Sequence, residues 1–189
     1  KPSNWRSKTS LDDFLIKNET IGISEVDTRE ITTLLREKGA MNCCIASLSV
    51  ITEKEAVSAA KEFDGLKGMD LAKVVSTETE YEWNIGIWPE NKKSDESYSV
   101  IAYDYGIKEN ILRLLTEHVG KVKVINARTP FEEIIKLNPK GIFLSNGPGD
   151  PEPCDYAIES IKKILQEKIP IFGICLDINY WHLLVEQVL

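Results

Sequence analysis

The hydrophobic and polar positions in the first eighty residues follow a mostly helical pattern. Ser10, Asp27 and Thr52 each precede acidic residues and then apolar residues at helical spacing, which is typical of helix N-termini. Gly39 follows basic residues, as is common where a helix ends. The apolar run from Met41 to Leu48 predicts a buried strand. We expect helices over residues 10–16, 27–38 and 52–63.

Residues 76–99 are polar and rich in turn-forming residues, which is typical of a linker between domains. The pattern of hydrophobic positions differs before and after this stretch. We therefore expect three parts: an N-terminal domain part over residues 1–80, a linker over 81–98 and a second domain over 99–189.

Short apolar runs alternate with amphipathic helical segments in the second domain. The runs are continuous rather than half polar, which favours a parallel sheet that is buried on both faces. The expected fold class is α/β, an open and mostly parallel sheet with helices on both faces, preceded by a smaller α+β region. We expect strands over residues 99–103, 122–125, 141–145 and 169–174, and helices from residue 108 and over 130–137 and 155–168.

Composition narrows the classes of partner. The 189 residues contain 23 Lys and Arg against 30 Asp and Glu, a net charge of −7, which argues against nucleic acid or an anionic membrane as a partner. No run approaches 18 apolar residues, and the first residues do not resemble a secretory signal. The four cysteines and two histidines lack metal-ligand spacing, so we expect no metal site, reduced thiols and a cytoplasmic location.

Ligands of such sheets bind outside the carboxyl ends of the strands. Three segments follow predicted strands: Asp104–Gly106, Ser145–Pro151 and Cys175. A cysteine between a strand and a helix N-terminus is exposed to the helix dipole, which favours the nucleophilic thiolate. The alternative is a buried cysteine that acts only as a small apolar side chain.

Gly147 and Gly149 flank Pro148 at the end of another predicted strand. Such a loop can present backbone N–H groups to a developing oxyanion, although a plain turn has the same composition. A nucleophile and an oxyanion loop on neighbouring strands together favour acyl transfer. No phosphate-binding motif is present, so we expect no nucleotide cofactor in this chain.

The strings SNGPGDP (145–151) and FGICL (172–176) resemble the class I (triad) glutamine amidotransferases. More narrowly, the chain resembles the small, glutamine-hydrolysing subunits of carbamoyl phosphate synthetases. The strings that carry this narrower resemblance lie at residues 2–6, 26–29, 35–39, 103–108, 110–113 and 153–157.

The resemblance implies hydrolysis of L-glutamine to glutamate and ammonia. A large synthetase subunit, which would dock on the N-terminal domain part, would hold ATP and Mg²⁺ and make carbamoyl phosphate for arginine and pyrimidine synthesis. By the family pattern Cys175 is the nucleophile, and the backbone of Gly147, Gly149 and Leu176 lines the substrate and oxyanion site. Asn179 stands where the family has a glutamine that contacts the substrate.

Two departures from the family pattern change the expected activity. Asp177 replaces a glycine, and a carboxylate there would raise the pKa of the nearby thiol. The His-Pro-Glu string that supplies the family's general base is not among these 189 residues. We therefore expect the chain alone to be inactive. The alternatives are a truncated, non-catalytic partner-binding module and a different cysteine hydrolase on the same kind of sheet.

Overall fold

The computed structural model describes residue 4 and residues 7–88 and 100–174. The chain divides into two compact units, residues 1–65 and residues 66–189. The sequence predicts a boundary near residue 80, whereas the division lies earlier, because Gly68, Thr77 and strand residues 81–83 bond to the second unit.

The described part of the first unit is helical. It contains α1 (Leu11–Lys17), α2 (Thr28–Lys38) and α3 (Glu53–Glu62). Each of the three predicted N-caps is confirmed. The Ser10 side chain accepts a hydrogen bond from Asp13 N, the Asp27 side chain from Arg29 N and Glu30 N, and Thr52 forms a reciprocal capping box with Glu55.

The strand predicted over Met41–Leu48 is wrong. These residues form no strand, and all of them are exposed. A strand must pair its backbone N–H and C=O groups with a neighbour, and the described residues of the first unit contain no strand that could be that neighbour.

In the described part of the second unit, five strands form a central sheet in the order β1-β3-β2-β4-β5. Three of its four pairings, β2 with β3, β2 with β4 and β4 with β5, are parallel. The α/β class predicted from the sequence is therefore confirmed. The strands are β1 (Tyr81–Trp83), β2 (Val100–Asp104), β3 (Val122–Asn126), β4 (Gly141–Leu144) and β5 (Ile171–Gly173).

Strand β1 corrects the expected linker. Tyr81, Glu82 and Trp83 pair antiparallel with β3 and form one edge of the sheet. The side chains of Tyr81 and Trp83 pack against the buried cluster that contains Val122 and Val124. Residues 81–83 are therefore part of the second unit.

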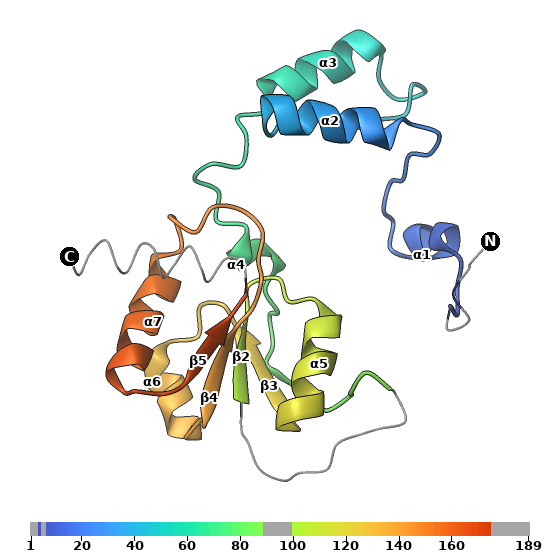
Figure 1. Cartoon of the computed structure of the whole chain (residues 1–189). Coiled ribbons are helices and arrows are strands. Elements are labelled where there is room, and N and C mark those ends of the chain that lie inside the picture. Colours follow the sequence, from blue (N-terminus) through green and yellow to red (C-terminus); the bar gives the residue numbers. More distant parts are fainter. Residues whose placement is uncertain (1–3, 5–6, 89–99, 175–189) are drawn as a thin grey trace. The chain divides into compact units, whose positions relative to one another are not determined.

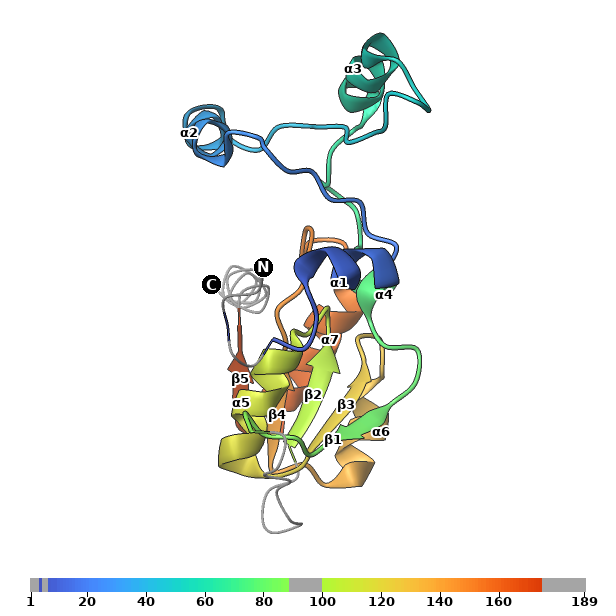
Figure 2. The same ribbon diagram turned by 90° about the vertical axis from the view of Figure 1, so that its right-hand side faces the viewer.

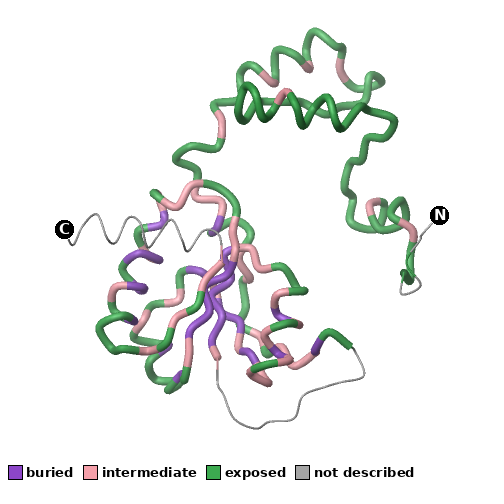
Figure 3. The backbone as a smooth tube through the Cα atoms, in the orientation of Figure 1, coloured by how far each residue is buried: buried purple, intermediate pink, exposed green. Residues whose placement is uncertain are grey.

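Helices cover both faces of the sheet (Figures 1 and 2). On one face, Leu112 of α5 (Glu109–Val119) packs with Ala102, Val124 and Phe143. On the other face, buried isoleucines of α6 (Phe131–Ile134) and α7 (Asp155–Gln166) pack against β2, β3 and β4. The 3₁₀ turn η1 (Ile135–Leu137) follows α6. The buried residues gather in the central strands and on the inner sides of these helices (Figure 3).

Residues 66–77, which we call the strap, run across the carboxyl ends of the strands and contain the short helix α4 (Ala72–Val75). Thr77 N donates to the Asp104 carboxylate at the end of β2. The Ser76 hydroxyl accepts from Ala127 N, just after β3. Ala72 is fully buried in the core. The strap therefore belongs to the edge of the sheet where a ligand site is expected.

Candidate functional site

A pocket of about 560 Å³ lies at the carboxyl ends of β2, β4 and β5. This volume is in the range of small-molecule sites. Its lining is mostly apolar, with the side chains of Lys108 and Asn146 as polar exceptions. The lining residues are Val75, Gly106, Lys108, Ile111, Asn146, Gly147, Pro148 and Ile174.

Asp104 shapes the turn between β2 and α5. Its carboxylate accepts hydrogen bonds from Gly106 N at 2.9 Å and from Ile107 N at 2.8 Å. Gly106 has φ +120°, and a Cβ there would lie 3.1 Å from Pro148 Cδ. Only glycine fits this backbone conformation beside the next loop. The turn after β2 and the loop after β4 are therefore in direct contact.

Two polar side chains of the loop after β4 strengthen this contact. The Ser145 hydroxyl accepts from Tyr105 N at 2.9 Å and donates to Asn146 O at 2.8 Å. The Asn146 amide donates to Gly106 O at 2.9 Å, and its oxygen accepts from Lys108 N at 3.3 Å. These hydrogen bonds fix one wall of the pocket against the other.

Gly147 and Gly149, the two predicted oxyanion residues, have different surroundings. Gly147 lines the pocket, whereas Gly149 has φ +86° and lies against Met69 and Leu71 of the strap. Within the part of the chain that the structure describes, neither N–H donates a hydrogen bond. Gly147 is half-buried, whereas Gly149 is exposed. A backbone N–H of a residue that lines a pocket is suited to an anionic ligand oxygen.

Ile174 is the last described residue, and it both lines the pocket and donates its N–H to Leu144 O at 3.2 Å. The predicted nucleophile Cys175 follows it directly in the sequence. Cys175, Leu176 and Asn179 lie outside the described residues, so their predicted roles stay predictions.

A second polar cluster lies behind the loop, on the strap and at the start of α7. The Asp70 carboxylate accepts from the Tyr156 hydroxyl at 3.1 Å, from Lys73 N at 3.1 Å and from the Cys154 thiol at 3.5 Å. Burial raises the pKa of Tyr156, and the neighbouring Cys154 and Asp70 raise it further. Tyr156 therefore remains a neutral hydrogen-bond donor to Asp70 at neutral pH.

Sequence reasoning gave no role to Asn146 or to the strap. Asn146 stands between Ser145 and Gly147, in a loop for which the sequence analysis predicts a role only for the two glycines. The strap offered no local signal, because its bonds join residues that are distant in the sequence, such as Gly68 and Asp150. Among the described residues no group of three or more His, Cys, Asp and Glu side chains could hold a metal ion. Over the same ranges, no helix has the length and apolar character needed to span a membrane.

Comparison with known proteins relates two parts of the chain to known families. Residues 101–180 match the family model of class-I glutamine amidotransferases. Residues 1–45 match the model of the carbamoyl-phosphate synthase small chain, CPSase domain. The fold of the second unit is consistent with that of class-I glutamine amidotransferases.

Individual proteins with similar sequences include small chains of carbamoyl phosphate synthase from several bacteria. The chain is 53% identical over 181 residues to the one from Pseudomonas syringae pv. tomato. It is 52% identical over 181 residues to those from Pseudomonas aeruginosa and Vibrio cholerae. Each alignment covers 92% of this chain and 48% of the relative, so the chain spans about half the length of these relatives. Over 92% of its own length, the chain is similar to carbamoyl phosphate synthase small chains.

Proposed function

We propose that the pocket binds L-glutamine and that Cys175 is the nucleophile that attacks its side-chain amide. One observation carries this proposal: Gly147, with its unpaired N–H, and Ile174, the residue before Cys175, line the same pocket. A nucleophile and an oxyanion donor must reach one carbonyl for acyl transfer. The similarity to class-I glutamine amidotransferases supplies the substrate class.

The proposed reaction has two steps. The Cys175 thiolate forms a bond to the amide carbon, and the Gly147 N–H stabilises the oxygen that becomes negative. The C–N bond then breaks, and the nitrogen takes up a proton and leaves as ammonia. Water hydrolyses the thioester, which yields glutamate and restores the thiol. We propose Gly149 and Leu176 as further backbone contacts and Asn179 as a further side-chain contact of the substrate.

The partner of this reaction would be a large synthetase subunit. We propose that it uses the released ammonia, that it holds ATP and Mg²⁺, and that the product serves arginine and pyrimidine synthesis in the cytoplasm. These proposals rest on the family. We also propose that the chain alone turns over little glutamine, because its 189 residues do not contain the family's His-Pro-Glu string.

The test is site-selective alkylation by a glutamine analogue with a chloromethyl ketone in place of the side-chain amide. We expect Cys175 to react faster than Cys43, which is exposed, and free glutamine to protect it. Iodoacetamide, which lacks the amino-acid part, is the matched control. Peptide mass spectrometry reads the labelled positions. Equal labelling of Cys43 and Cys175, without protection by glutamine, would refute the proposed pocket.

A non-catalytic, partner-binding role is the second candidate, and one observation favours it. The described residues of the first unit include none that is buried, and Leu11, Phe14 and Ile16 of α1 are all more than half exposed. Apolar side chains on amphipathic helices are typical of a surface that a partner covers. Binding of a large synthetase subunit without any selective labelling of Cys175 would favour this candidate over the first.

A further inference from the structure

The loop after β4, residues 145–154, is held from behind by the strap. Gly68 N donates to the Asp150 carboxylate at 3.1 Å, and the same carboxylate accepts from Glu152 N at 3.0 Å. These two N–H groups lower the pKa of Asp150. The carboxylate thus joins the strap to the loop and also fixes the turn within the loop.

The backbones of the strap and the loop also approach closely at Gly149. A Cβ at this residue would lie 3.2 Å from Met69 O and 3.2 Å from Leu71 Cβ. Such a separation is tighter than most real side-chain contacts, so the position of the strap limits where Gly149 can lie. Gly147, two residues earlier, lines the pocket.

Asp70 is the residue that fixes the strap at this point. One oxygen of its carboxylate accepts from Lys73 N within the strap, from Cys154 at the end of the loop and from Tyr156 in α7. Hydrogen bonds to an ionised acceptor are stronger than those between neutral groups. None of these contacts reaches the pocket itself, so Asp70 can affect the site only through the loop or through Val75, the strap residue that lines the pocket.

We infer that Asp70 is a positioning residue, which holds the strap against residues 145–154 and thereby fixes the Gly147 N–H at the pocket wall. Its effect on chemistry rests on the proposed function, whereas its effect on the loop does not. An oxyanion donor must be held within a fraction of an ångström of its working position. A loosened strap would misplace this donor without removing any atom of the pocket.

The experiment compares Asp70→Ala and Asp70→Asn with the unaltered protein. Alanine removes the acceptor, whereas asparagine keeps a side-chain oxygen at the same place. The matched control is Glu78→Ala, which removes an exposed carboxylate just beyond the strap. If Asp70→Ala does not fold, the variant Tyr156→Phe is used in its place, because it removes only one hydrogen bond to Asp70.

Two readouts are needed. Hydrogen exchange by mass spectrometry follows the amides of residues 146–152. Labelling kinetics compare the glutamine chloromethyl ketone with iodoacetamide at Cys175. For Asp70→Ala we expect faster exchange and roughly 10- to 100-fold slower labelling by the glutamine analogue. The rate with iodoacetamide should not change, and Asp70→Asn should restore part of both effects.

The two readouts also separate the failure of the inference from that of the proposed function. If the unaltered protein shows no glutamine-selective labelling, the proposed function fails, and the exchange data alone decide whether Asp70 positions the loop. Unchanged exchange in Asp70→Ala overturns the inference in either case. Selective labelling that survives in Asp70→Ala overturns it as well, because the donor would then not depend on the strap.

Discussion

The Asp104 carboxylate lies 2.9 Å from the backbone nitrogen of Thr77, and this hydrogen bond joins the strap to the end of β2. The same side chain accepts from two N–H groups of the turn before α5. Asp104 is only 6% exposed. A buried carboxylate is costly unless such donors surround it. Asp104 therefore stabilises the strap and the pocket turn together.

The first prediction concerns Asp104→Ala. We expect the free energy of unfolding to fall by about 2–4 kcal/mol, because three backbone N–H groups lose their acceptor. Asp104→Asn should lower the free energy of unfolding by a smaller amount, because it retains one acceptor oxygen. It should still be less stable than the unaltered protein, because its NH₂ group faces an N–H donor. Urea denaturation monitored by tryptophan fluorescence measures both variants. Glu78→Ala is the control, and a loss in Asp104→Ala no larger than in the control would contradict the prediction.

The second prediction separates backbone strain from close packing at the β4 loop. Gly149 and Gly68 have similar positive φ angles, +86° and +77°, but only Gly149 has atoms near the position of a Cβ. In both alanine variants the left-handed backbone conformation should lower the free energy of unfolding by roughly 1–2 kcal/mol. Gly149→Ala should lose about 1–3 kcal/mol more, because its Cβ overlaps the strap.

Denaturation curves of the two glycine variants provide the comparison. In addition, Gly149→Ala should slow the selective labelling of Cys175, because the loop or the strap must shift. Equal stability of the two variants would show that the strap yields to the added methyl group at no cost.

The local pattern of the sequence was sufficient for the helix ends and the central strands. Ser10, Asp27 and Thr52 cap helices because a capping side chain bonds to N–H groups two or three residues away. The parallel strands are continuous apolar runs because both of their faces are covered. These relationships need no knowledge of distant residues.

The features that were missed depend on residues far apart in the sequence. The three residues of β1 form a strand because β3, about forty positions later, pairs with them. The strap is held by Asp104 and Asp150, which neighbouring residues do not reveal. Met41–Leu48 shows the converse error, since an apolar composition alone does not supply a pairing partner.

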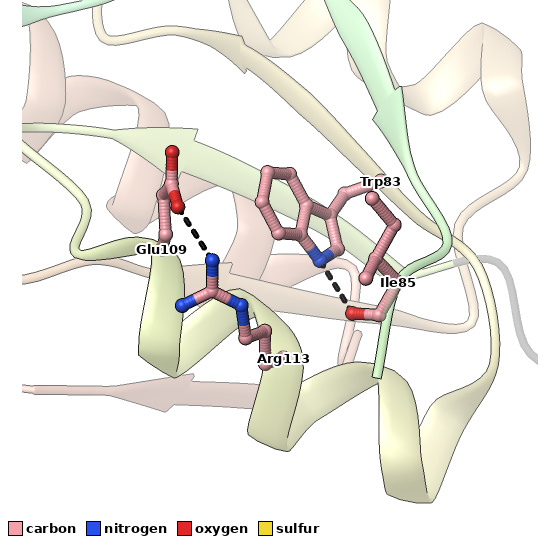
Figure 4. A network of polar contacts seen from close by, with 4 residues as sticks. All are labelled: Trp83, Ile85, Glu109 and Arg113. Atoms are coloured by element: carbon pink, nitrogen blue, oxygen red, sulfur yellow. Dashed lines mark hydrogen bonds and ion pairs between the residues drawn. The ribbon is translucent and has the colours of Figure 1, made fainter. Parts of the chain in front are cut away.

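The third prediction concerns the attachment of β1 to α5. The Arg113 guanidinium lies over the Trp83 ring at 5.8 Å, and it forms an ion pair with Glu109 one turn earlier at 2.7 Å (Figure 4). Trp83 Nε1 donates to Ile85 O at 2.7 Å. Arg113→Ala should destabilise the second unit by about 1 kcal/mol, most of it from the lost stacking on the ring.

A double-mutant cycle with Trp83→Phe and Arg113→Ala tests this assignment. Trp83→Phe keeps a ring but loses the bond to Ile85, so both single variants should be less stable. Their effects should not add, since each removes part of one contact. Strict additivity would show that the Arg113 and Trp83 side chains stabilise the protein independently. Glu109→Gln is the control for the ion pair, and we expect it to have a smaller effect than Arg113→Ala.

The last prediction is a pH dependence that arises at Tyr156. Its pKa is raised above the ordinary value of 10.0, first by burial and then by Cys154 and Asp70. The folded protein therefore holds this proton more tightly than the unfolded chain. The stability that Tyr156 contributes is complete below pH 10 and is lost as the pH rises above that value.

Tyr156→Phe should accordingly be less stable than the unaltered protein at pH 8, because Asp70 loses a donor. Above pH 10 the unaltered protein should lose stability more steeply than the variant, so the difference in stability between them narrows. Burial also raises the pKa of Tyr103, whose hydroxyl bonds to Thr129 O. That residue is present in both proteins, so its effect cancels in the comparison. Denaturation midpoints at each pH measure the two slopes, and parallel slopes would exclude Tyr156 as the titrating group.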